Sequence, residues 1–205
     1  AQKLELSPRE RRMLLLAGDP RASSVYRDVS RLEPSDPTVL AMMAHAMRRE
    51  VAAMSQEGEQ PDPQTLATAA EIMDQALQME PYWVWGRAER AFIALDMGKP
   101  DLALEVLQPV TENMAQVWKA RMLASSRLQK HDVAARAADM WLHASGDDLP
   151  PESLVMIASA HARAGNEERA VELGERVLEK IPEGPSPLRT QVENILGTAS
   201  PVPSR

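Results

Sequence analysis

Residues 151–182 read PESLVMIASAHARAGNEERAVELGERVLEKIP, and this stretch predicts two amphipathic helices. In its first half, apolar and small residues recur at the spacing of one buried helix face, at Leu154, Ile157, Ala158 and His161. Gly165 interrupts the pattern because glycine takes a positive φ at no steric cost, and Asn166 can cap a following helix. A second apolar face runs through Ala170, Val171, Gly174, Val177, Leu178 and Ile181. Pro182 ends that helix, since proline lacks the amide hydrogen that a continuing helix needs.

This helix pair resembles a tetratricopeptide repeat (TPR), a unit of about 34 residues with the pattern W-x2-L-G-x2-Y, then A-x3-F, then P. The pattern positions are occupied in order by Leu154, Ile157, Ala158, His161, Ala170 and Pro182. Gly174 stands where the family has a bulky residue, so we expect looser packing at that point. The resemblance implies an all-α fold, in which helix pairs stack as an α-solenoid and the first helix of each pair lines a concave face.

Parts of the pattern recur along the chain. Pro81 and Pro182 both close apolar helices and lie 101 residues apart, close to three repeats of about 34 residues. The A-x3-F…P portion recurs twice before that, at Ala22, Tyr26 and Pro34 and at Ala69, Met73 and Pro81. A partial copy follows at Ala103 and Leu107. The sequence therefore predicts about five TPR-like helix pairs.

These landmarks divide the chain into consecutive repeats, a cap and a tail. The expected segments are 1–34 (divergent first repeat), 35–83 (second repeat with a long loop), 84–115 (third repeat), 116–150 (fourth repeat), 151–184 (fifth repeat), 185–197 (capping helix) and 198–205 (disordered tail). We expect the C-terminal capping helix because the last repeat of a solenoid otherwise exposes apolar surface. Its apolar face is predicted at Leu188, Val192 and Ile195.

The composition argues against several classes of function. The chain of 205 residues is 44% hydrophobic and 26% charged, which is ordinary for a globular protein. Its net charge of −7 argues against general nucleic-acid binding, which needs a strongly basic face. No apolar run approaches the roughly 20 residues that span a bilayer, so we expect no membrane segment in this chain.

No catalytic or metal-binding motif is evident. The absence of cysteine rules out thiolate metal sites and a cysteine nucleophile. The four histidines form no H-x3-H or H-E-x-x-H pair, and the sequence has no G-x-S-x-G, P-loop or G-x-G-x-x-G motif. His161 stands at the tyrosine position of the repeat, where a packing role is expected. We therefore expect a non-enzymatic protein with no catalytic residue, metal or cofactor.

The resemblance also assigns candidate binding residues. In TPR proteins, the second, fifth, ninth, twelfth and thirteenth positions of each first helix face the concave groove. Carried onto this sequence, these positions give eight candidate peptide-binding residues: His45, Arg48, Arg49, Trp85, Phe92, Trp118, Arg121 and Arg163. Aromatic anchors beside arginines are typical of peptide-binding hot spots. The alternative is that Trp85 and Phe92 are core residues.

Methionines form a second feature of the predicted second repeat. Six of them fall on its two helices: Met42, Met43, Met47, Met54, Met73 and Met79. They either fill the core or form an adaptable binding surface, because the flexible methionine side chain suits both roles.

Three hypotheses of function follow. The first is a scaffold that binds a protein or peptide partner in the concave groove. The second rests on residues 162–196, which resemble the end of periplasmic TPR proteins of cytochrome c maturation. The matching residues are Pro185, Pro187 and Arg189, which precede a short helix. Leu188 departs from the pattern, because these proteins usually have tryptophan before that arginine. That resemblance implies a periplasmic domain that holds an apocytochrome segment, with a cytoplasmic location as the alternative. The third is a self-assembling structural protein, which would form homo-oligomers.

Overall fold

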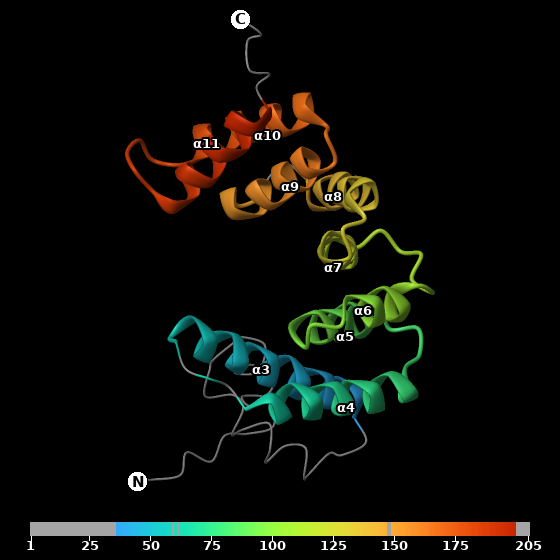
Figure 1. Ribbon diagram of the computed structural model, residues 1–205. Coiled ribbons are helices and arrows are strands. Elements are labelled where there is room, and N and C mark those ends of the chain that lie inside the picture. Colours follow the sequence, from blue (N-terminus) through green and yellow to red (C-terminus); the bar gives the residue numbers. More distant parts are fainter. Residues whose placement is uncertain (1–35, 59, 61, 147–148, 200–205) are drawn as a thin grey trace, which may run out of the picture. The chain divides into compact units, whose positions relative to one another are not determined.

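The computed structural model describes residues 36–58, 60, 62–146 and 149–199, and this part is built of α-helices without a strand (Figure 1). The helices are α3 (Pro37–Gln56), α4 (Pro63–Met79), α5 (Val84–Asp96), α6 (Pro100–Leu107), α7 (Ala115–Arg127), α8 (His131–Ser145), α9 (Pro151–Arg163), α10 (Glu167–Lys180) and α11 (Pro187–Ala199). The all-α prediction is confirmed. The expected first repeat and the end of the expected tail, from residue 200, lie outside the described residues. Within the described ranges, every helix is too short or too polar to cross a bilayer.

The chain divides into two compact units, residues 1–99 and residues 100–205. The described part of the first unit contains α3, α4 and α5, and that of the second contains α6 to α11. Each unit is described by itself below.

In the first unit, aspartate and proline set the starts of α3 and α4. The Asp36 carboxylate accepts hydrogen bonds from the amides of Thr38 and Val39, at 2.8 and 3.3 Å. The Asp62 carboxylate accepts one from the amide of Gln64 at 2.9 Å. Each aspartate precedes a proline at the first helical position, where the missing amide hydrogen costs nothing. Local sequence thus determines both helix starts.

The first unit packs through small side chains. Its buried core cluster is Leu40, Ala41, Ala44, Ala69, Ala70, Ile72, Met73, Ala76 and Ile93. The alanines let α3 and α4 approach closely, and Ile93 brings α5 into the same core. Arg90 of α5 also donates to both carboxylate oxygens of Asp74 on α4, at 2.7 and 3.0 Å. Met73 is fully buried, and Met43 and Met47 are partly buried against this core, so these three methionines contribute to core packing; the binding-surface role stays a prediction.

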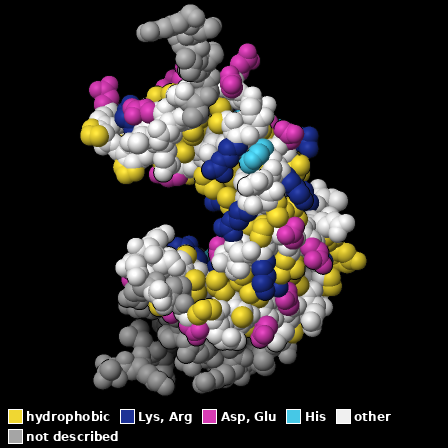
Figure 2. Space-filling model, in the orientation of Figure 1, with side chains coloured by type: hydrophobic (Ala, Val, Ile, Leu, Met, Phe, Trp, Pro, Cys, Tyr) yellow, Lys and Arg dark blue, Asp and Glu magenta, His cyan; other side chains and the backbone are white. Residues whose placement is uncertain are grey.

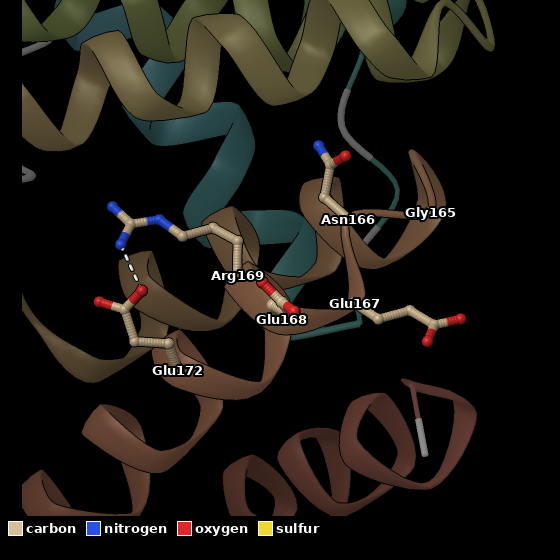
Figure 3. A pocket seen from close by; sticks show the side chains of 6 residues that line it. All are labelled: Gly165, Asn166, Glu167, Glu168, Arg169 and Glu172. Carbon is tan, nitrogen blue, oxygen red and sulfur yellow. Dashed lines mark hydrogen bonds and ion pairs between the residues drawn. The ribbon is translucent and has the colours of Figure 1, made fainter. Parts of the chain in front are cut away.

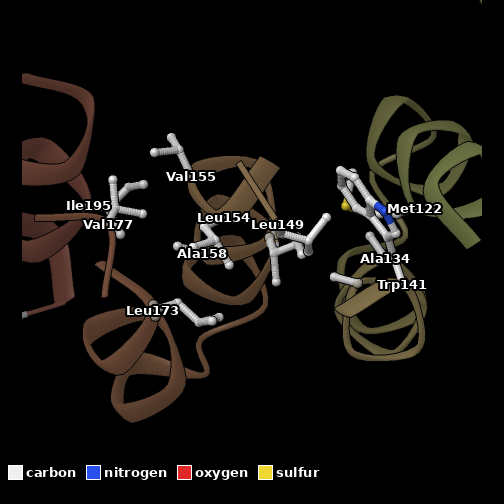
Figure 4. Packing of buried hydrophobic residues seen from close by; sticks show 14 of the residues in the cluster. Met122, Ala134, Trp141, Leu149, Leu154, Val155, Ala158, Leu173, Val177 and Ile195 are labelled. Atoms are coloured by element: carbon white, nitrogen blue, oxygen red, sulfur yellow. The ribbon is translucent and has the colours of Figure 1, made fainter. Parts of the chain in front are cut away.

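The second unit has one continuous core that runs from α7 to α11 (Figure 4). Figure 4 shows Met122 of α7 beside Trp141 of α8, and Leu154 of α9 beside Leu173 of α10. The residues that the sequence places on the first helix face, Leu154, Ile157 and Ala158, are fully buried. The spacing in residues 151–182 therefore predicted the buried face correctly.

Three helix pairs share one type of turn. A residue with positive φ ends the first helix at Gly98 (73°), Gln129 (58°) and Gly165 (74°). The next amide then donates to a carbonyl five residues earlier: Lys99 to Ala94, Lys130 to Ser125 and Asn166 to His161. This is the hydrogen bond of the Schellman motif, which usually has glycine at the left-handed position. The three turns provide a common register for comparing the repeats.

Gln129 is expected to cost stability because it occupies a glycine position. A non-glycine residue in the left-handed region destabilises the folded protein by roughly 1–2 kcal/mol. Replacing it with glycine removes this strain but also increases the conformational entropy of the unfolded chain, which offsets about 0.4–1 kcal/mol of the gain. Gln129→Gly should therefore raise the free energy of unfolding by about 0.5–1 kcal/mol in urea titrations. The reciprocal variant, Gly165→Ala, should lower it. A Gln129→Gly protein that is less stable than the parent would contradict the assignment of strain to this turn.

The capping helix is α11, which packs on both α9 and α10. Val192 is fully buried and Ile195 nearly so, in agreement with the predicted apolar face, while Leu188 is partly buried. A Cβ atom on Gly174 would lie 3.0 Å from the Leu196 side chain and 3.4 Å from Val192. The expectation that Gly174 loosens the packing is wrong: the absence of a side chain there is what lets α11 approach α10.

Candidate protein-interaction site

Six side chains from α3 and α5 form a contiguous group, which we call the α3–α5 cluster: His45, Arg48, Trp85, Glu89, Phe92 and Asp96. The two residues from α3 are three positions apart, and the four from α5 follow at spacings of four, three and four. These spacings place each set on one face of its helix. The cluster therefore lies where the two helix faces meet.

Glu89 is the electrostatic centre of the cluster. Its side chain is only 6% exposed, and its Oε1 accepts a hydrogen bond from Arg48 Nε at 2.5 Å and lies 2.9 Å from His45 Nδ1. Burial alone would raise the pKa of Glu89, but the hydrogen bond from His45 and the positive charge of Arg48 outweigh it and hold the pKa below its ordinary value. Glu89 is therefore an anion at neutral pH, and it fixes the position of Arg48.

Arg48 joins Glu89 to Phe92, and His45 joins Glu89 to Trp85. Arg48 Nη1 donates to Asp96 Oδ2 at 3.1 Å, and the Arg48 guanidinium carbon lies 5.2 Å from the centre of the Phe92 ring. The Trp85 ring lies 5.9 Å from that of His45 and 5.3 Å from that of Trp83. Trp85 and Phe92 are both half-buried. Each thus contacts its own unit and still offers surface to a partner.

The structure brings together four of the eight candidate residues: His45, Arg48, Trp85 and Phe92. Arg49 is exposed, and no contact joins it to the cluster among the residues that the structure describes. The other three candidates belong to the second unit, where Arg163 is exposed at the end of α9. Sequence reasoning missed Glu89, although a signal existed. It lies four residues after Trp85 and three before Phe92, on the helix face that they share.

The register of the fourth repeat differs from the predicted one. Trp118 lies eleven residues before the turn residue Gln129, as Leu154 lies eleven before Gly165. Trp118 therefore occupies the position of a fully buried residue of the fifth repeat, and Arg121 occupies that of Ile157. Neither stands at a position that the resemblance assigns to the groove. Both instead line a pocket with residues of α6 and α8.

A larger hollow, of about 570 Å³, lies at the start of α10 (Figure 3). Its charged residues are Glu167, Glu168, Arg169 and Glu172, and Figure 3 shows Glu167 and Glu172 pointing in opposite directions. Arg169 Nη1 donates to Glu172 at 2.5 Å. No group of three or more His, Asp or Glu side chains suited to a metal occurs in the described part of the chain. We assign no ligand to this hollow.

His161 has the structural role expected of it. It is buried, its Nε2 lies 3.1 Å from Asp139 Oδ1, and its Nδ1 lies 3.3 Å from Asn166 Nδ2. Burial lowers the pKa of His161, and the attraction of Asp139 only partly opposes this effect. The ring is therefore neutral at pH 7 and links α9 to α8 and to the start of α10.

No protein-family model and no curated protein matches this sequence. Solved structures do resemble it. TTC0263, a thermophilic TPR protein of Thermus thermophilus, shares 19% identity with a TM-score of 0.65, over 92% of this chain and 96% of that one. MamA of Desulfovibrio magneticus RS-1, from its residue 41 to the end, shares 19% identity with a TM-score of 0.61, over 82% of this chain and 89% of that one. With the repeated helix pairs and turns described above, these likenesses show that the chain has the tetratricopeptide-repeat α-solenoid fold.

Proposed function

We propose that this protein is a non-enzymatic scaffold that binds a segment of a partner protein across α3 and α5. The observation that carries the proposal is the α3–α5 cluster, in which an arginine held by two carboxylates lies over the half-buried Phe92 ring, and a second half-buried ring, Trp85, lies beside His45. Aromatic residues and arginine are the side chains most enriched in binding hot spots. Arg48 is already ordered by Glu89 and Asp96, so a partner that contacts it loses little side-chain entropy.

The charges of the cluster indicate what kind of segment it prefers. One cation, Arg48, is already paired with two carboxylates, Glu89 and Asp96, so Arg48 offers no unpaired charge to an acidic segment. We expect the bound segment to place an apolar or aromatic side chain on Trp85 and Phe92 and to carry neutral or basic residues beside it.

The experiment is to capture a partner by affinity purification with mass spectrometry and then to measure its affinity for purified variants. Trp85→Ala is expected to weaken binding by about thirtyfold, because truncating a hot-spot aromatic residue costs about 2 kcal/mol or more. Tyr82→Ala is the matched control, since Tyr82 is a neighbouring aromatic residue that is 88% exposed and outside the cluster. Thermal unfolding of both variants separates lost binding from lost folding.

Wild-type affinity in folded Trp85→Ala and Phe92→Ala proteins would refute the assignment of binding to this face. The resemblance of residues 162–196 to cytochrome c maturation proteins, and the hypothesis of self-assembly, stay predictions. In the described structure Arg189 donates to the Pro182 carbonyl at 3.4 Å, and its amide donates to Ser186 Oγ at 3.1 Å. These contacts give Arg189 a role in the connection between α10 and α11.

A further inference from the structure

A pocket of about 320 Å³ lies among α6, α7 and α8, and it carries a different chemistry from the α3–α5 cluster. We call it the α6–α8 pocket; its lining includes Trp118, Arg121, Ser125, Val133, Arg136 and Met140. Val133 and Met140 are 42% and 36% exposed and lie seven residues apart on α8, so they offer apolar surface on one face of this helix beside the pocket. In Figure 2, hydrophobic and basic side chains are interspersed over α7 and α8.

The floor of the pocket is held in place before any ligand arrives. Trp118 Nε1 donates to Asn113 Oδ1 at 2.7 Å, and the Arg121 guanidinium lies 4.7 Å from the centre of the Trp118 ring. Arg121 Nη2 donates to the carbonyls of Leu107 and Val110, at 2.9 and 2.7 Å. Both hydrogen bonds are donated by the same nitrogen of Arg121, Nη2. The guanidinium and the indole thus form a rigid surface, which reduces the entropy lost when something binds.

The positive charges of the pocket are not neutralised from within. Neither Arg121 nor Arg136 forms an ion pair with any residue that the structure describes, and no Asp or Glu side chain lines the pocket. Burial lowers the pKa of Arg121, but an arginine remains a cation at neutral pH. The chain as a whole carries a net charge of −7, so two unpaired arginines on one apolar pocket stand out against an acidic background.

Ser125 adds an independent observation. Its hydroxyl is fully buried on the lining of the pocket and has no hydrogen-bond partner among the described residues. An unsatisfied buried hydroxyl costs free energy, and a ligand that supplies a polar atom recovers it.

We propose that the α6–α8 pocket is a second docking site, which takes a partner-protein segment that carries a carboxylate beside an apolar side chain. The apolar side chain packs against Trp118, Val133 and Met140. The carboxylate pairs with Arg136 and approaches Arg121, because guanidinium groups bind carboxylates through short, charge-assisted hydrogen bonds. The α6–α8 pocket is thus expected to bind an acidic segment, whereas the α3–α5 cluster is expected to bind a neutral or basic one. The two proposals are therefore tested independently.

The test is a selection of short random peptides displayed on phage, run against the full-length protein and against its Met140→Glu variant. Glutamate at this exposed helical position keeps the helix but repels a carboxylate and removes apolar contact. Peptides recovered by the wild type and lost by Met140→Glu should be enriched in Asp or Glu next to Leu, Ile, Phe or Met. The strongest such peptide is then synthesised, and its Kd is measured for each variant.

Arg136→Gln should raise the Kd of this peptide by about tenfold or more, as expected for the loss of one charge-assisted hydrogen bond. Lys130→Gln, which removes the same charge at the exposed start of α8 outside the pocket lining, should leave the Kd unchanged, as should Trp85→Ala. The proposal is overturned if no peptide depends on Met140, if the dependent peptides are basic, or if Arg136→Gln binds as the wild type does. Should Met140→Glu fail to fold, Arg136→Gln replaces it in the selection, because Arg136 is exposed.

Discussion

Replacing Val192 with Asp is expected to detach α11 from the last repeat and to lower the free energy of unfolding by about 3–5 kcal/mol. Val192 is fully buried among residues of α9 and α10 and approaches the backbone of Gly174. A carboxylate there has no cation to pair with in the surrounding apolar cluster. Because α11 packs on α9 and α10, the substitution can also open α11 locally, and the loss is then limited to the free energy that holds α11 in place.

Urea unfolding and hydrogen exchange of the α11 amides measure this effect. Gln191→Asp is the matched control, since Gln191 is exposed on the same helix and a surface substitution there should change the free energy of unfolding by no more than about 0.5 kcal/mol. If α11 did not pack as described, Val192→Asp would behave like Gln191→Asp. A loss of protection confined to α11 would identify local detachment instead of global unfolding.

The second large effect is expected at Glu89. Glu89→Gln should lower the free energy of unfolding at pH 7 by about 2 kcal/mol, because it removes the charge that Arg48 and His45 contact. Breaking a fully buried ion pair costs about 3–5 kcal/mol. We expect less here because Arg48 is partly exposed and keeps its bond to Asp96. Glu71→Gln, on the exposed face of α4, is the control and should have little effect.

The stability difference between the wild type and Glu89→Gln should also depend on pH. The pKa of Glu89 in the folded protein lies below the ordinary value of 4.5, so its contribution to stability is fully present above pH 4.5. That contribution is lost as the pH falls through the lowered pKa. The stability difference between the wild type and Glu89→Gln should therefore shrink as the pH falls below 4.5. A difference that stays constant into strong acid would show that Glu89 is not stabilised as an anion.

Local sequence determined the helices and most of their ends. The three- and four-residue spacing of Leu154, Ile157 and Ala158 predicted a buried face, and the face is buried. An aspartate cap followed by a proline stands at the starts of α3 and α4, and Gly165 marked the turn of the fifth repeat. These features act between residues a few positions apart, so one sequence is enough to recognise them.

Glutamine at a glycine position hid the register of the fourth repeat. Gln129 adopts a positive φ, as Gly98 and Gly165 do, but glutamine is not a residue type for which a positive φ is predicted. Without that landmark, Trp118 and Arg121 were assigned to the groove. The hydrogen bond of the turn, from the Lys130 amide to the Ser125 carbonyl, identifies Gln129 as the turn residue and so sets the register of the fourth repeat.

The α3–α5 cluster and the fit of α11 were decided only by the tertiary structure. Arg48 and Glu89 are 41 residues apart, and no local pattern states that a buried carboxylate on one helix will meet a cation on another. Gly174 appeared to be a defect because the residues that fill its space, Val192 and Leu196, come from a different helix. Helical periodicity is a property of neighbouring residues, so the sequence determined which faces are buried. Which side chains meet across those faces depends on how the helices pack against one another, and that was decided by the tertiary structure.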